Sequence, residues 1–387
     1  MERIPLAVFL VLFLGLLLVG CKRAEKGTFH ENFLSHSVMK KLQGFAAMGV
    51  ILHHVTQIVT QYGRFNKGLI NVMVDAGVFF TALFFFCSGY GLVTSLLQKE
   101  EYLNVFLKKR LSAVVVPFYV CNLLFILVSL IAGARPKPLE LVLYLSGLVM
   151  LNDQMWFIVE LAVLYVIFYL CYRKRKEGSV ALWKMAVILV VMTAVSLLLG
   201  HDGLPDSQGL WFFGEWWYNT TWTFFVGMVV AKYREQVVSF AKRWYKCLLP
   251  AGIVVFPVMY GATMYMIGHV GYWAEWPGHR GYLEKFLTFC VQAPTVIIFV
   301  LLLFLISMKV QFGNRMLAFL SVIALEMYLL QNIFITYLRP FLKVDVLYYI
   351  GVYACTILLA FVVHKVDQKI IKGIQNKNRE ESIEKRV

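Results

Sequence analysis

The chain has 387 residues, of which 60% are hydrophobic and 15% are charged, and its mean hydropathy is +0.71. Long apolar runs recur along the whole length, which excludes an ordinary soluble domain and indicates a polytopic helical membrane protein. The formal net charge is +15, but the basic residues cluster at the ends of the apolar runs. That is the pattern of membrane topology, and it gives no indication of nucleic-acid binding.

The predicted fold is all-α, a transmembrane helical bundle with ten core spans and one leading apolar segment at 4–20. Each core run reaches the ~17–25 residues that a helix needs to cross a bilayer. The expected core spans are 42–62, 70–97, 111–133, 153–172, 180–199, 209–230, 247–268, 286–306, 315–338 and 345–366. The run at 139–151 is too short to cross and is expected to be interfacial or re-entrant. The chain thus divides into an N-terminal segment with a linker (1–37), the ten-span domain (38–366) and a basic tail (367–387).

Basic residues alternate between the loops of this predicted bundle. Six loops or ends on one side carry basic clusters, whereas each opposite loop carries at most two basic residues. Because positive charge is retained on the inner side of a membrane, both ends of the ten-span core are expected in the cytoplasm. The predicted location is the cell membrane, with many passes.

The N-terminal segment has two interpretations. Residues 18–21 read LVGC after a short apolar stretch, which resembles a lipoprotein cleavage site and would place Cys21 outside. Lys22, Arg23 and Lys26 follow at once, however, and basic residues are expected inside. The alternative is an extra span whose N-terminus lies outside. The seven cysteines are dispersed and show no metal-ligand spacing, so neither a disulfide framework nor a metal site is predicted.

One polar stripe runs along the first core span. At helical spacing, a single face carries Gln43, Ala47, Val50, His54, Gln57 and Gln61. His54 therefore shares a face with every glutamine of the span, whereas His53 points about 100° away. If the span begins at Leu42, His54 lies about 18 Å along it, past the middle of the ~30 Å hydrocarbon core. An ionisable group at that depth indicates either a buried histidine bonded to a neighbouring helix or a general base.

Three acidic residues also fall within predicted spans. Asp75 lies about 8 Å along the 70–97 span, so it is expected either to orient His54 or to lie in interfacial water. Glu160 and Glu326 lie deeper in their spans. Carboxylates at membrane depth mark sites or structural hydrogen-bond partners, and both interpretations stand for these two.

A cationic cluster of Lys108, Lys109 and Arg110 precedes the third core span. It indicates either a topology signal or a phosphate-binding site, in which arginine supplies bidentate contacts. Two outer loops are rich in aromatic residues, at 211–219 (WFFGEWWYN) and 271–280 (GYWAEWPGHR). They indicate an interfacial aromatic belt or rings on which a carbohydrate stacks.

Short motifs follow one another along most of the chain. In order they are 42–54 (LQGFAAMGVILHH), 84–90 (FFFCSGY), 106–111 (FLKKRL), 117–119 (PFY), 156–157 (WF) with Tyr165, 225–228 (FVGM), and 320–321 (LS) with 326–330 (EMYLL). The ordered set resembles the membrane acyltransferase family 3. The opening span of that family ends in a functional histidine, and the spacing from Gly44 and Ala46 places it on His54.

The resemblance implies an integral-membrane O-acyltransferase. Such enzymes move acyl groups, commonly acetyl from acetyl-CoA, onto hydroxyls of cell-surface or lipid-linked carbohydrates. His54, with Asp75, would take the proton of the acceptor hydroxyl, in a direct transfer or through an acyl-histidine. Lys108, Lys109 and Arg110 would bind the acyl-CoA phosphates. The expected partners are acyl-CoA, a carbohydrate and membrane lipid, with no bound cofactor and no metal. Expected pocket-lining residues are Gln43, His53, Gln57, Ser88, Tyr90, Trp156, Glu160, Glu326 and Gln331.

The chain departs from the family pattern at three positions. Gln43 stands where a basic residue usually precedes the signature histidine by eleven residues, Ala113 replaces the second arginine of an Arg-x-x-Arg cluster, and Gln331 replaces a histidine. A catalytically inactive member is therefore a second interpretation. A transporter of a polar solute or lipid-linked sugar is a third, because ten spans with buried carboxylates suit one, although neither an inverted repeat nor matched broken helices are evident.

Overall fold

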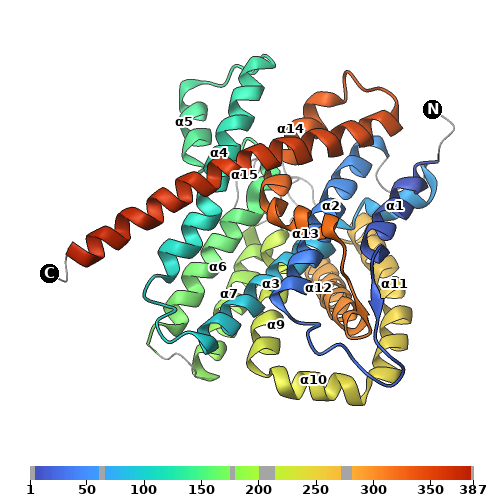
Figure 1. Cartoon of the computed structure of the whole chain (residues 1–387). Helices are drawn as coiled ribbons and strands as arrows, with labels where there is room; N and C mark the ends of the chain where they lie inside the picture. Colours follow the sequence, from blue (N-terminus) through green and yellow to red (C-terminus); the bar gives the residue numbers. More distant parts are fainter. Residues whose placement is uncertain (1–4, 61–65, 175–178, 200–213, 272–280, 385–387) are drawn as a thin grey trace. The chain divides into compact units, whose positions relative to one another are not determined.

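The structure is a computed structural model that describes residues 5–60, 66–174, 179–199, 214–271 and 281–384. The described chain is almost entirely helical, which confirms the predicted all-α class (Figure 1). The described strands, β1 (Lys22–Arg23) and β2 (Val310–Gln311), form one short antiparallel ladder. Two compact units result: one comprises Met1–Ser95, Leu182–Gln208 and Phe212–Val322, and the other comprises Leu96–Ala181, Gly209–Trp211 and Ile323–Val387.

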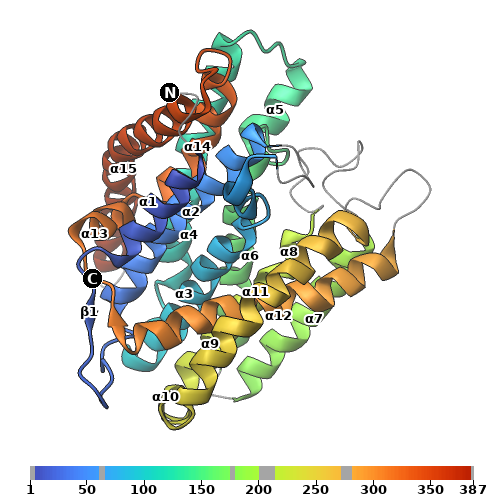
Figure 2. The same ribbon diagram turned by 90° about the vertical axis from the view of Figure 1, so that its right-hand side faces the viewer.

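The first unit contains most of the helices. They are α1 (Ala7–Leu18), α2 (His36–Val59), η1 (Gly68–Met73), α3 (Gly77–Gln98), α7 (Ser179–Leu199), α8 (Trp216–Asn219), α9 (Thr221–Lys232), α10 (Arg234–Arg243), α11 (Tyr245–His269), α12 (Tyr282–Ser307) and α13 (Arg315–Val322). Helices α11 and α12 lie side by side, and α2 packs against α13 (Figure 2). The approach of α2 to α13 needs Gly44, because a Cβ there would lie 2.6 Å from the Leu317 carbonyl oxygen.

A second close crossing in this unit joins two of the sequence motifs, FFFCSGY on α3 and FVGM on α9. A Cβ at Gly89 would lie 2.0 Å from the carbonyl oxygen of Phe224, and one at Gly227 would lie 2.3 Å from that of Phe86. The two glycines therefore let the backbones of α3 and α9 touch. Small residues serve this purpose at helix interfaces in membranes, so these motifs have a packing role in the fold.

The N-terminal segment is tied to the chain before α13. Strand β1 follows Cys21 directly and pairs with β2, and the Asn314 side chain donates to the Leu16 and Val19 carbonyls at the end of α1. Cys21 thus lies at the end of the unit that carries Lys309 and Arg315. Both interpretations of the N-terminal segment, the extra span and the lipoprotein cleavage site, stay predictions. Burial raises the pKa of the Cys21 thiol.

The second unit is built around three long helices. Its elements are α4 (Phe106–Ile131), α5 (Pro138–Ser146), η2 (Asp153–Met155), α6 (Trp156–Tyr172), α14 (Ala324–Leu338) and α15 (Asp345–Glu384). Helix α4 packs against α6, α14 and α15, and α14 packs against α15. The buried Asn152 donates to the Leu329 carbonyl at 3.2 Å and accepts from Asn332 at 2.9 Å, which ties η2 to α14.

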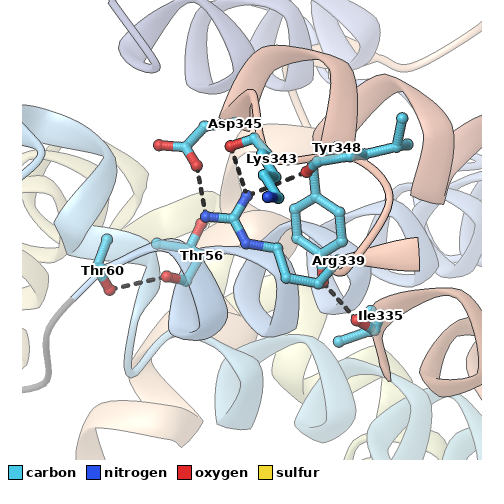
Figure 3. A network of polar contacts seen from close by, with 8 residues as sticks. Thr56, Thr60, Ile335, Arg339, Lys343, Asp345 and Tyr348 are labelled. Atoms are coloured by element: carbon cyan, nitrogen blue, oxygen red, sulfur yellow. Dashed lines mark hydrogen bonds and ion pairs between the residues drawn. The ribbon is translucent and has the colours of Figure 1, made fainter. Parts of the chain in front are cut away.

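The turn between α14 and α15 is closed by Arg339 (Figure 3). Its guanidinium lies 2.8 Å from the Asp345 carboxylate, reaches the Leu342 carbonyl, and stacks over the Tyr348 ring at 5.0 Å. The Tyr348 hydroxyl in turn donates to the Ile335 carbonyl at 2.6 Å, and the Tyr348 side chain is fully buried. One arginine and one tyrosine thus hold the two helices together at this end.

Replacing Tyr348 by phenylalanine is expected to lower stability modestly, by about 0.5–1.5 kcal/mol, since it removes one neutral hydrogen bond and preserves the packed ring. A thermal-unfolding comparison in detergent measures the effect. Tyr282→Phe provides a control, because the Tyr282 side chain is exposed on α12. A Tyr348→Phe protein as stable as the wild type would mean that the hydroxyl does not hold the turn.

The number of spans differs from the prediction. Among the described residues, eight helices are long and apolar enough to cross a membrane, or nine if the pair broken at Ile323, α13 and α14, counts as one span. The expected sixth core span, 209–230, is two short helices, α8 and α9, that meet at Thr220, and its first residues lie outside the described chain. The final helix also continues far past 366, so the predicted boundary with the tail is no helix end.

Candidate functional site

The two adjacent histidines lie in the last third of α2, in the first unit. This helix begins at His36 after Ser35, whose hydroxyl accepts from the Val38 amide at 3.4 Å, as serine does at an N-cap. His53 is 9% exposed, whereas His54 is half-buried. The ring centroids are 4.5 Å apart with planes inclined by 52°. The pair therefore forms one cluster, although the residues point to different sides of the helix.

His53 is held against the start of α3. Its Nδ1 lies 2.9 Å from the Met73 carbonyl oxygen, which can only accept, so Nδ1 carries the proton. A Cβ at Gly77, the first residue of α3, would lie 2.3 Å from the His53 ring. Glycine at position 77 is therefore required for the ring to occupy this place.

His54 is oriented through Gln57. The Gln57 amide nitrogen donates to the Val74 carbonyl at 3.1 Å, which turns the amide oxygen toward His54 Nδ1 at 3.2 Å. Nδ1 of His54 must then be the donor, and Nε2 carries the lone pair. His54 Nε2 can therefore act as a base. His53 Nε2 lies against Gly77, where a Cβ would be 2.5 Å from it, and the His53 ring also interacts with the Val74 carbonyl.

The predicted polar stripe is only part of the buried surface of α2. Leu42, Ile51 and Leu52 lie off the stripe and are fully buried, because neighbouring helices surround this span. Gln43 is half-buried. Gln61, the last residue of the stripe, lies outside the described residues. His53 is consequently more buried than a residue that merely flanks the stripe.

Asp75 lies in the turn before α3 rather than inside a span, because the helix begins at Gly77 and not near residue 70. The same turn supplies the carbonyls of Met73 and Val74 to His53 and Gln57. The structure therefore brings half-buried Asp75 into the segment that bonds the histidine pair.

Two other predicted residues lie farther along α3. Ser88 is half-buried, and Tyr90 is buried with its ring stacked on Phe86. They stand on either side of Gly89, where α3 crosses α9. Ser88 and Tyr90 are therefore packed among other residues of the first unit.

The cationic cluster begins α4, in the second unit. Lys108 and Lys109 are exposed. Arg110 is half-buried and donates to the Tyr102 hydroxyl from Nε at 3.0 Å and from Nη2 at 2.8 Å. The two lysines are thus open to a ligand, while the arginine is held in place by a tyrosine.

The other predicted residues of the second unit lie on α6 and α14. Trp156 begins α6, and Glu160 is fully buried one turn later. Gln331 is fully buried and donates to the Tyr328 carbonyl at 3.1 Å. Glu326 is 3% exposed and pairs with His364 Nδ1 at 2.7 Å. Neither His364 nor its neighbour Asp367 was expected from the sequence.

The aromatic loops fall largely outside the described residues, including 211–213 and 272–280. Trp217 and Tyr218 are described, and both are buried. The Tyr218 ring packs edge-on against Phe289 at 5.9 Å. These two rings therefore belong to the core of the first unit, and neither an interfacial belt nor a carbohydrate platform accounts for them.

A family comparison decides the class of this protein. The acyltransferase domain of the acyltransferase 3 family matches residues 41–365, which span the histidine pair, the cationic cluster and the late motif. The chain belongs to the acyltransferase 3 family. Comparisons with curated proteins and with solved structures gave no match. The protein is thus a multi-pass membrane acyltransferase, and the transporter interpretation is set aside.

The chain still departs from the acyltransferase 3 family pattern at three positions, Gln43, Ala113 and Gln331. Gln331 is buried and hydrogen-bonded, and Ala113 is exposed on α4. Gln43 lies on α2, about 16 Å along the helix from His54 at ~1.5 Å per residue. None of the three substitutions disturbs the bonds that orient the histidines.

Proposed function

We propose that this acyltransferase moves an acyl group, most simply acetyl, from cytoplasmic acyl-CoA to a hydroxyl of a cell-surface or lipid-linked carbohydrate. The observation that carries the proposal is the histidine pair. Each Nδ1 faces an acceptor, at 2.9 Å for His53 and 3.2 Å for His54, so each Nε2 has a lone pair. A histidine whose tautomer is fixed in this way is suited to general-base catalysis.

In the proposed reaction, His54 Nε2 removes the proton of the acceptor hydroxyl as its oxygen attacks the thioester carbonyl carbon. The carbon–sulfur bond breaks, the electron pair leaves on sulfur, and the CoA thiolate takes up one proton. The products are the O-acyl ester and CoA. An acyl-histidine on Nε2 is the variant of the same scheme in which transfer occurs in two steps.

Gln57 and His53 act on His54 in this proposal. Gln57 keeps the proton on Nδ1 through its amide oxygen. His53 lies against His54 and takes its position from the Met73 carbonyl. Asp75, in the same turn, offers a carboxylate that favours the imidazolium formed during transfer.

The donor is proposed to bind at Lys108 and Lys109, with Arg110 beside them. Acyl-CoA carries several phosphates, and exposed lysines supply strong charge-assisted contacts to them. The positive-inside bias supports a cytoplasmic position for this end of α4, with both ends of the core on that side of the cell membrane.

Replacing both Lys108 and Lys109 by glutamine is expected to weaken the binding of CoA. Hydrogen bonds to charged groups contribute about 1.5–3 kcal/mol each, so the dissociation constant is expected to rise about tenfold or more. Titration calorimetry with CoA at low and high salt measures this, and the variant should show the weaker salt dependence. Lys242→Gln with Arg243→Gln provides a control of equal charge on α10. An equal loss of CoA affinity in the two double variants would mean that binding depends on net charge alone.

A deletion strain tests the function as a whole. Mass spectrometry of surface glycans is expected to show loss of an O-acyl group, restored by the wild-type gene and not by a His54→Asn variant. Unchanged glycans in the deletion strain would contradict the carbohydrate acceptor. Restoration by the variant would contradict the role of His54.

A further inference from the structure

A buried cluster of one histidine and two carboxylates lies in the second unit. Glu326 is on α14, while His364 and Asp367 are three residues apart on α15 and therefore share a face. His364 Nδ1 lies 2.7 Å from Glu326 Oε1. Glu326 is 3% exposed and Asp367 is 0% exposed, yet the His364 side chain retains 20% exposure.

Three carboxylate oxygens of this cluster are buried, and within the described chain they accept no hydrogen bond from a donor group. They are Oε2 of Glu326 and both oxygens of Asp367. Asp367 interacts electrostatically with Glu326 and His364, and the two carboxyl groups can share a hydrogen bond when one of them is protonated. Two ionised carboxylates with one imidazolium would leave a net negative charge in a low-dielectric interior, which is costly. One further proton, shared by the two carboxyl groups, makes the cluster neutral.

Within the described chain, the titratable group of α4 that interacts electrostatically with Asp367 and Glu326 is the thiol of Cys121. Lys365 is exposed, with its ammonium over the Phe361 ring at 4.2 Å. The described residues contain no group of three or more His, Cys, Asp or Glu side chains suited to a metal ion. A proton shared by the two carboxyl groups beside His364 balances their charge.

The cluster lies inward from the cationic cluster along the same helices. Near its start, α4 contacts α15 through Ser112 and Gln375, at 3.4 Å. Nine residues farther along α4 is Cys121, beside Asp367 and Glu326. At ~1.5 Å per residue this is about 14 Å. Lys108 and Lys109 thus lie at one end of α4, and the cluster lies farther along the same helix.

We propose that Glu326, His364 and Asp367 form a proton-storing site within the second unit. The two carboxyl groups share one proton, and the His364 imidazolium, whose side chain retains 20% exposure, passes it to and from water. A proton that leaves the pair is replaced by one taken up from water, so the exchange balances. The inference does not depend on the proposed function.

Infrared difference spectroscopy of the full-length protein in nanodiscs tests the stored proton. A carbonyl band of a protonated carboxylic acid is expected in the wild type at neutral pH. Because the proton needs both carboxyl groups, the band should disappear in Asp367→Asn and in Glu326→Gln alike. It should persist in Glu101→Gln, which removes an exposed carboxylate. A band that persists in both cluster variants would overturn the proposal.

Discussion

Replacing His54 by asparagine is expected to lower the rate of acyl transfer by about 10²–10⁴-fold, the range that a positioned general base contributes. The amide nitrogen of asparagine can take the place of Nδ1 and still donate to the Gln57 oxygen, which accepts from His54 at 3.2 Å. The variant therefore lacks Nε2 while its local hydrogen bond is retained. A fall in the rate with unchanged thermal stability isolates the base.

His53→Asn is the matched control. Its amide nitrogen can donate to the Met73 carbonyl as Nδ1 does at 2.9 Å, and it removes the other Nε2 of the pair. We expect the transfer rate of this variant to stay within about tenfold of the wild-type rate, because displacing a neighbouring residue lowers the rate less than removing the general base does. Loss of transfer with His53→Asn alone would assign the base to His53. Normal transfer by His54→Asn would contradict the proposed mechanism.

The second large effect concerns the crossing of α3 and α9. Gly89→Ala places a methyl group where a Cβ would lie 2.0 Å from the Phe224 carbonyl oxygen. The obstacle is backbone, so no side-chain rotation relieves it and the two helices must separate. Overpacking of this kind typically costs about 1–3 kcal/mol, and occasionally more. We expect Gly89→Ala to destabilise the protein by an amount at or above the upper end of this range, and to lower the yield of folded protein.

Gly91→Ala on the same helix is the control for this prediction. A Cβ at Gly91 would have no atom within 4 Å, and alanine stabilises a helix by about 0.5–1 kcal/mol over glycine. Thermal-unfolding midpoints of the two variants in detergent should therefore move in opposite directions. A Gly89→Ala protein as stable as Gly91→Ala would mean that α3 and α9 do not touch at this glycine.

The class of the fold could be predicted from the sequence, because apolar runs of bilayer length report helices directly. The start of α2 could not be placed from the sequence, because the helix begins at His36, before the apolar run that starts at Leu42. The polar residues between them are helical without adding to the apolar run. The 209–230 run was taken as one span because the break at Thr220 has no glycine or proline to mark it.

The candidate site was predictable only in part. The histidine pair stands out as polar residues in an apolar helix. The bonds that fix their tautomers come from main-chain carbonyls of Met73 and Val74, which leave no signature in side-chain identity. His364 and Asp367 were missed because they stand on either side of the predicted boundary between the 345–366 span and the basic tail, beside Lys365 and Lys369. Glu326 could be noticed in the sequence, but its partner on another helix could not.

The central claim is that the protein catalyses acyl transfer from acyl-CoA to a carbohydrate hydroxyl. Purified full-length protein in proteoliposomes, given radiolabelled acetyl-CoA and a glycan fraction that lacks O-acyl groups, measures it most directly. The account predicts alkali-labile label in the carbohydrate, with CoA released in equal amount, and loss of both with His54→Asn. Binding of acetyl-CoA by the wild-type protein without any labelled carbohydrate or released CoA would contradict it.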